Sequence, residues 1–251
     1  DSAYTYNLML ATVFALSMLG SFGFVYNFIQ TVAPRRVAPG GEPHRTPAIR
    51  TIGAVRMRMV GWGCRGDRTS CIAVLVAFFT AILLNFGGNL HTVWHFATQQ
   101  SKPYWYPDAT RFIPYTIHEF PAYSHVVADL HGHLLDLPIV LSFLTILIIF
   151  IITPVKKNLS FILGFLLGIM TMTNFWDLPI YGLVFGLVVV TKGLSSHSKV
   201  NPYEVYRLIR QISLILLIAL GTAILASLPF HLNFKNLPAK ISLATLKYKN
   251  S

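Results

Sequence analysis

Charged residues are few in this chain: Asp, Glu, Lys and Arg together make up only 12% of its 251 residues. About a quarter is usual for a soluble domain. Only nine residues are acidic, and the formal net charge is +11. Cysteine is also scarce. Cys64 and Cys71 fit neither a CxxC motif nor a disulfide framework, so both are expected to be plain thiols. Hydrophobic side chains make up 54% of the chain, which excludes an ordinary soluble domain.

Long runs without any charge indicate membrane spans. Asp, Glu, Lys and Arg are all absent from residues 7–29, 71–90, 137–153 and 211–230. Each run is close to the ~20 residues that a helix needs to cross the hydrocarbon layer. The sequence therefore predicts a polytopic helical membrane protein.

A longer apolar stretch, residues 159–191, is interrupted only by Asp177, with Pro179 following it. As one helix it would measure ~50 Å, well beyond a hydrocarbon core of ~30 Å. Proline disfavours helix in the residue before it and removes a backbone donor. We therefore expect a tight hairpin of two helices here, in preference to one kinked helix.

The predicted fold is an all-α transmembrane bundle that forms a single membrane domain over residues 1–251. A polar loop, residues 91–133, is expected to contain short interfacial helices. The chain starts with Asp1 and its first span begins within seven residues, so it is expected to be a piece of a longer protein with earlier spans missing. The six expected spans lie near residues 7–31, 71–90, 134–154, 158–175, 178–192 and 211–229.

Basic residues predict the orientation of these spans. The connection 32–70 contains eight arginines and two acidic residues, and the connections 155–157 and 193–210 are also basic. These three connections fall on one side, which the positive-inside rule makes cytoplasmic. The loop 91–133 then faces outward across the plasma membrane, although the lysines after residue 234 oppose this orientation. Membrane orientation explains the net charge better than nucleic-acid binding does.

The arginine-rich segment 32–70 differs in composition from the rest of the chain, which favours lysine. Two interpretations stay open. It is either a disordered cytoplasmic loop close to anionic lipid or the product of a local reading-frame error in the gene. No function is assigned to it.

Ionisable residues gather at one place, because residues 119–136 contain three acidic residues and three histidines. Such groups are costly in a membrane and usually occupy a site or a water-filled cavity. In an extended segment, Asp129, His131 and His133 would point the same way, which suits Zn²⁺ or Mn²⁺ with water in an open position. Two alternatives stay open: hydrogen-bonded groups that cap a helix starting near Leu134, and direct contact with a ligand or phosphate.

Glu119 can serve as a general base if partial burial raises its pKa, or it can pair with Arg111 in a turn fixed by Pro121. Arg111 can clamp a phosphate through its planar guanidinium, or simply balance the nearby acids. Asp177 lies where a helix breaks within an apolar stretch, and an acidic residue inside a membrane span is a candidate functional residue. With His231, these groups are predicted to line one outer-face cavity.

Several motifs occur in order along the chain: Ile113-Pro114, Ile117-His118-Glu119-Phe120-Pro121, Asp129-Leu130-His131-Gly132-His133, Asn174-Phe175-Trp176-Asp177-Leu178-Pro179 and Leu228-Pro229-Phe230. Together they resemble the uncharacterised "YYY" family of membrane proteins over most of the chain except 32–70. The family pattern has Pro where Gly132 lies and Asn where His118 lies. The second departure puts any role of His118 in doubt.

The resemblance implies an architecture similar to that of C-type glycosyltransferases, which transfer a sugar from a polyprenyl-phosphate donor on the outer face. Such enzymes use an outer-loop carboxylate to activate the acceptor hydroxyl, and some require a divalent metal (here Mn²⁺, Mg²⁺ or Zn²⁺). The resemblance is compatible with Glu119 and Asp129 as the catalytic carboxylates and with Arg111 as a partner for the phosphate. The candidate metal ligands, from their spacing, are Asp129, His131 and His133. The other candidate substrate-binding residues are His118, Asn174, Trp176, Asp177 and His231.

Two rival functions stay open. One is a transporter or channel with a site at the broken span 174–179. The other is a membrane-embedded hydrolase with a metal held by Asp129, His131 and His133.

Overall fold

The computed structural model describes residues 2–32, 68–99, 102–105, 107–111, 113, 115–195 and 201–234. In these residues all regular secondary structure is helical, so the prediction of an all-α membrane bundle is confirmed. The helices are α1 (Ser2–Val32), α2 (Arg68–Phe86), α3 (His91–Thr98), α4 (Asp108–Arg111), α5 (Pro121–Val126), α6 (Gly132–Ile152), α7 (Lys157–Thr173), α8 (Asp177–Ser195) and α9 (Pro202–Asn233).

Helix length decides how many of these can cross a membrane. Among the described helices, α1, α6, α8 and α9 are long and apolar enough, and α2 with α3 forms a pair bent by 68° that gives a fifth candidate. Helix α7 is apolar but has only 17 residues, or ~26 Å at 1.5 Å per residue. The count by this criterion is therefore four or five, below the six spans expected.

Helix α9 starts nine residues before the expected span at 211. Its first turn has a local cause. The side chain of Asn201 accepts a hydrogen bond from the backbone N–H of Tyr203, at 3.2 Å, and Pro202 occupies the first helical position. Both residues are favoured at helix starts, so the helix extends beyond its apolar stretch.

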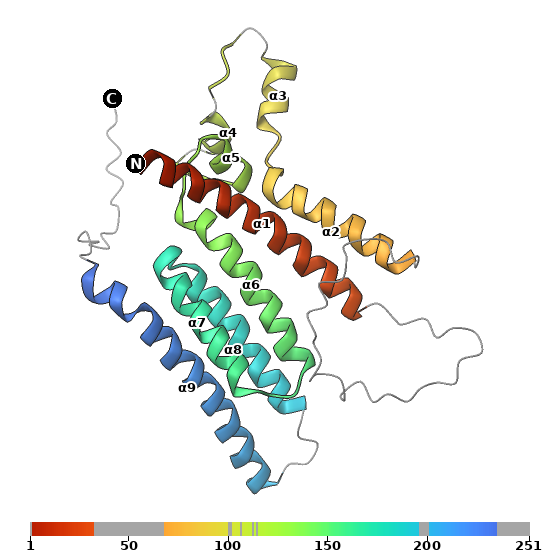
Figure 1. Ribbon diagram of the computed structural model, residues 1–251, viewed down its shortest axis with the longest axis vertical. Coiled ribbons are helices and arrows are strands. Elements are labelled where there is room, and N and C mark those ends of the chain that lie inside the picture. The colour runs from red at the N-terminus through yellow and green to blue at the C-terminus, as the bar shows by residue number, and fades with distance from the viewer. Residues whose placement is uncertain are drawn as a thin grey trace, which may run out of the picture.

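The long helices form one bundle (Figure 1). Helix α1 packs against α2 and α6, and α7 packs against α6, α8 and α9. The α6–α7 turn, the end of α8 and the start of α9 lie at one end of the bundle. The start of α6, the α7–α8 turn and the short helices α4 and α5 lie toward the other end. The polar segments at 119–136 and 174–177 therefore share one end.

Small residues allow α7 and α9 to pack closely. A Cβ atom at Gly164 would clash with the backbone of Ala219, and one at Gly168 would lie 2.7 Å from the carbonyl oxygen of Ala223. Close backbone approach of this kind is typical of helix pairs in membranes. The resulting core includes the buried rings of Phe143, Phe150 and Phe185, and it fixes α6 relative to α7 and α8.

The chain between α7 and α8 forms the expected hairpin and not one kinked helix. The backbone N–H of Asp177 donates to the carbonyl of Asn174 at 3.0 Å, and the Asn174 side chain donates to the Asp177 carboxylate at 2.9 Å. Asp177 is also the first residue of α8, where the positive end of the helix dipole stabilises an acidic side chain.

One expectation is wrong. Cys71, near the start of α2, is disulfide-bonded and is not a plain thiol. The arginine-rich segment 33–67, including Cys64, lies outside the described residues.

Candidate functional site

A tyrosine from α1 holds the turn that leads into α6. The Tyr6 hydroxyl donates to the carbonyl of Ala128 at 2.9 Å and accepts from the backbone N–H of Leu130 at 3.0 Å. Ala128 has a φ of 56°, in the left-handed region that a non-glycine residue seldom adopts. The turn is therefore fixed by a contact between residues more than 120 positions apart.

Glu119 reaches the same place from the other side of α5. It lies just before Phe120, whose backbone is extended and which precedes the first helical residue, Pro121. The Phe120 ring packs over Gly88 at the end of α2, where a Cβ atom would lie 2.8 Å from the ring. Because Gly88 leaves this space, the Phe120 ring anchors the residue next to Glu119 against α2.

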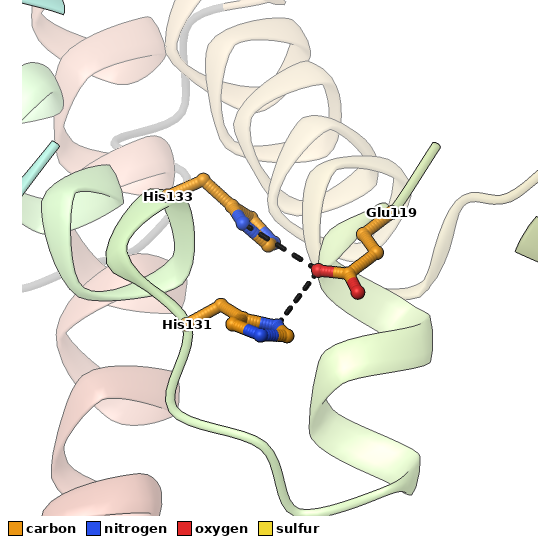
Figure 2. A group of neighbouring side chains, drawn as sticks. All are labelled: Glu119, His131 and His133. Atoms are coloured by element: carbon orange, nitrogen blue, oxygen red, sulfur yellow. Dashed lines mark ion pairs between the residues drawn. The ribbon is translucent and has the colours of Figure 1, made fainter. Parts of the chain in front are cut away.

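Glu119, His131 and His133 converge at the start of α6 (Figure 2). The Glu119 Oε2 atom lies 2.7 Å from Nδ1 of His131 and 3.9 Å from Nδ1 of His133. One ligand atom from each residue lies within 4.8 Å of the other two. We call these three residues the trio. Among the described residues, the trio is the set of three His or acidic side chains whose ligand atoms lie close enough together to hold one ion.

A buried serine orients His133. The Ser124 hydroxyl, on α5, lies 3.2 Å from Nε2 of His133, and Ser124 is fully buried. Because Nε2 is engaged by Ser124, the other ring nitrogen is directed toward Glu119. Partners of this kind fix the tautomer and orientation of histidine ligands. Sequence reasoning did not identify Tyr6, because its contacts lie more than 120 residues away. It also missed Ser124, whose contact with His133 depends on how the chain folds back between α5 and α6.

Asp129 lies beside the trio. Its Oδ2 atom is 3.3 Å from Nδ1 of His131, and its side chain is 46% exposed. The extended conformation expected for 129–133 ends at His131, which has a φ of −65° and a ψ of 157°, and α6 begins at Gly132. Glu119, rather than Asp129, is therefore the carboxylate that lies within reach of both histidines.

The trio offers two imidazole nitrogens and one carboxylate oxygen. This donor set suits Zn²⁺ or Mn²⁺ with an open coordination position. Without a metal, the short contact between the Glu119 carboxylate and the His131 imidazole is an arrangement that supports proton transfer. At 21% exposure the Glu119 carboxylate can still be reached from solvent.

A second polar group lies further along α6. Asp136 is fully buried, and its Oδ1 atom accepts a hydrogen bond from the Thr173 hydroxyl at 2.5 Å. The carboxyl of Asp177 is close enough to that of Asp136 for the two charges to interact. Through the Thr173 hydroxyl, the Asp136 carboxyl links α6 to the end of α7.

The other predicted site residues are not all gathered here. Asn174 bonds Asp177, as described above, whereas Trp176 is 75% exposed. Arg111 is exposed and stacks over Trp105 at 5.8 Å from the ring centroid; no ion pair joins it to Glu119.

Two of the predicted histidines belong to other contacts. The backbone N–H of His118 donates to the carbonyl of Thr110 at 3.0 Å. His231 is exposed at the end of α9, where its ring contacts Phe230, and none of its contacts within the described residues reaches the trio.

His125 has a structural role. Its ring packs edge-on against Phe14 of α1, with centroids 4.8 Å apart, which joins α5 to the bundle. Burial lowers the pKa of His125 below its usual value.

Residues 1–249 match the model of a family described as uncharacterized membrane proteins, DUF2298. The chain belongs to this family. Membership confirms the resemblance to an uncharacterised family of membrane proteins and extends it through the segment 32–70, which the sequence motifs did not cover. No curated protein and no solved structure is significantly similar to the chain. The family assignment thus establishes a membrane protein without naming a reaction.

Proposed function

We propose that the chain is a membrane enzyme whose trio acts on the polar head of a lipid-linked substrate. The reaction we favour is transfer of a sugar from a polyprenyl-phosphate donor at the outer face of the plasma membrane. The observation that supports it is the convergence of Glu119, His131 and His133 at one end of an apolar bundle. A reactive group at that level can meet a lipid headgroup while the lipid chain stays in the hydrocarbon layer.

Glu119 is the proposed general base. Its carboxylate would accept the proton of the acceptor hydroxyl as that oxygen bonds to the anomeric carbon of the sugar. The bond between this carbon and the phosphate oxygen breaks, and polyprenyl phosphate leaves. His131, at 2.7 Å, would stabilise the Glu119 carboxylate before the transfer. The exposed guanidinium of Arg111 is a candidate partner for the phosphate.

A divalent cation held by the trio would neutralise phosphate charge or lower the pKa of a bound water. The close approach of the three ligand atoms also favours a second candidate function, a metal-dependent hydrolase. The fit of the donor set to zinc is the reason to keep it.

The test uses purified chain in lipid nanodiscs loaded with polyprenyl-phosphate sugars and supplied with a soluble oligosaccharide as the hydroxyl acceptor, with acceptor-dependent release of polyprenyl phosphate as the readout. Glu119→Gln should reduce release by about 10²-fold or more, the usual contribution of a general base. Glu204→Gln, in the first turn of α9, is the matched control and should behave like the unaltered chain. Equal release by both variants would defeat the proposal.

Elemental analysis separates the two candidates. Stoichiometric zinc that disappears in His131→Ala, together with water-dependent release of the sugar, would favour the hydrolase. Polyprenyl-phosphate binding without bound metal would favour glycosyl transfer with Glu119 acting alone.

A further inference from the structure

Asp136 is a buried carboxyl that does not belong to the trio. The residue is fully buried among the apolar residues of α6. Its Oδ1 atom accepts from Thr173, but its Oδ2 atom is buried and receives no N–H or O–H donor from the described residues. A buried polar atom without a donor is usually explained by a bound water, an ion or a proton.

A second carboxyl approaches the same point from another helix. Asp177 opens α8, and its carboxyl is close enough to that of Asp136 for the two charges to interact. The Asn174 amide donates to Asp177 Oδ2 at 2.9 Å, which fixes the direction of this carboxyl. Tyr181, one turn further along α8, lies close enough to both carboxyls for their charges to act on it.

No basic side chain among the described residues forms an ion pair with either carboxyl. The ion pairs in this part of the chain involve only the trio and Asp129. Two carboxylates that approach each other in an apolar setting repel one another and lose hydration. A positive charge that is not supplied by a side chain would resolve both costs.

We propose that Asp136 and Asp177, with the Thr173 hydroxyl, bind a hard divalent cation of the Mg²⁺ class. All the donors at this place are oxygen atoms, which magnesium and manganese prefer over nitrogen. Magnesium is commonly held by one or two carboxylates and fills its remaining positions with water or substrate phosphate. The trio contains two imidazole nitrogens, which favour metals such as Zn²⁺ over Mg²⁺. The two sites are therefore chemically distinct.

The two sites are neighbours along α6. His133 and Asp136 are three residues apart, a spacing that places side chains on adjacent positions of one helix face. A cation at Asp136 would therefore lie on the same side of α6 as the trio. The inference does not require the trio to bind a metal or to be catalytic.

The experiment titrates Mn²⁺, as a paramagnetic substitute for Mg²⁺, into purified full chain in detergent, and measures free Mn²⁺ by electron paramagnetic resonance. Asp136→Asn and Asp177→Asn should each weaken one Mn²⁺ site at least about tenfold, since loss of a supporting group alone costs 10- to 100-fold. Asp108→Asn, in α4, is the matched control. Excess Mg²⁺ should displace the Mn²⁺ from this site.

A double variant, Glu119→Gln with His131→Ala, keeps the two proposals apart. It should retain the Mn²⁺ that depends on Asp136 and Asp177, whatever happens to metal at the trio. An asparagine at 136 can still accept from Thr173 and can donate to Asp177, so this variant should elute as a folded, monodisperse protein. Mn²⁺ binding that is unchanged in both asparagine variants, or lost only in the double variant, would overturn the inference.

Discussion

The Tyr6 hydroxyl connects α1 to the turn before α6, and its removal provides a direct test of how the trio is held. The substitution Tyr6→Phe deletes one oxygen and keeps the ring. That oxygen makes two hydrogen bonds, at 2.9 Å to Ala128 and at 3.0 Å to Leu130. A hydrogen bond of this kind contributes about 0.5–1.5 kcal/mol net.

The side chain of Tyr6 is 42% exposed, so water can partly replace the lost partner. We therefore take the lower half of the range for each bond and expect a total of about 1–2 kcal/mol. This loss applies to local opening of the turn and not to the whole bundle. Because 1.4 kcal/mol corresponds to about tenfold in an opening equilibrium, amide exchange should accelerate by about 5- to 30-fold.

Hydrogen–deuterium exchange followed by mass spectrometry measures this effect on a peptide that covers residues 127–133. Tyr4→Phe is the matched control, because Tyr4 lies on the same helix, is 78% exposed and makes no hydrogen bond to the turn. Exchange in peptides from α7 and α9 should be the same in all three proteins. If residues 127–133 are as protected from exchange in Tyr6→Phe as in Tyr4→Phe, the Tyr6 hydroxyl does not hold the turn and the reasoning fails.

Three other predictions test the site and its support. Ser124→Ala should weaken Zn²⁺ or Co²⁺ binding at the trio by about 10- to 100-fold in a metal titration, because His133 loses the partner that orients it. Ser124→Thr should restore binding. Equal affinity of the unaltered chain and both variants would refute the orienting role of Ser124. Gly164→Ala should lower the temperature of thermal unfolding, since its Cβ atom would clash with the backbone of α9, whereas Gly182→Ala meets nothing within 4 Å and should be neutral. The pKa of His125 is lowered by burial, so below about pH 6.5 the unfolded segment binds a proton that the folded one does not, and α5 loses stability as the pH falls. The protection factors of α5 amides, taken relative to the unfolded exchange rate at each pH, should therefore be lower at about pH 5.5 than at about pH 7.5. His125→Phe should remove this difference, and equal protection at both pH values in the unaltered chain would refute the role of His125.

The helices were predictable from the sequence because the uncharged runs encode them directly. The break before Asp177 was predictable for the same reason, since a charge and Pro179 interrupt an apolar stretch too long for one helix. Helix α9 starts nine residues before the expected span at 211, because that span was bounded by charge and not by helix-start signals. The signal was present in Asn201 and Pro202, which favour a helix start regardless of hydropathy.

The site was predictable only in part. The alternation of His131 and His133 placed two imidazoles in one segment, and this local spacing required no knowledge of the fold. The partners of these histidines come from elsewhere. Glu119 lies next to Phe120, whose ring packs over Gly88 in the connection between α2 and α3. Asp136 comes near Asp177 only when α6 lies against the α7–α8 hairpin. A single sequence carries no sign of such contacts.

Gly132 explains why these two groups of residues occur together. A Cβ atom at this position would clash with the carbonyl oxygen of Thr173, so the start of α6 and the end of α7 meet backbone to backbone. The residues on either side of Gly132 belong to the trio, and the Thr173 hydroxyl on the far side of the contact holds Asp136. A larger residue here would have to move α6 away from α7, which would shift the histidines and separate Asp136 from its partners in the same step.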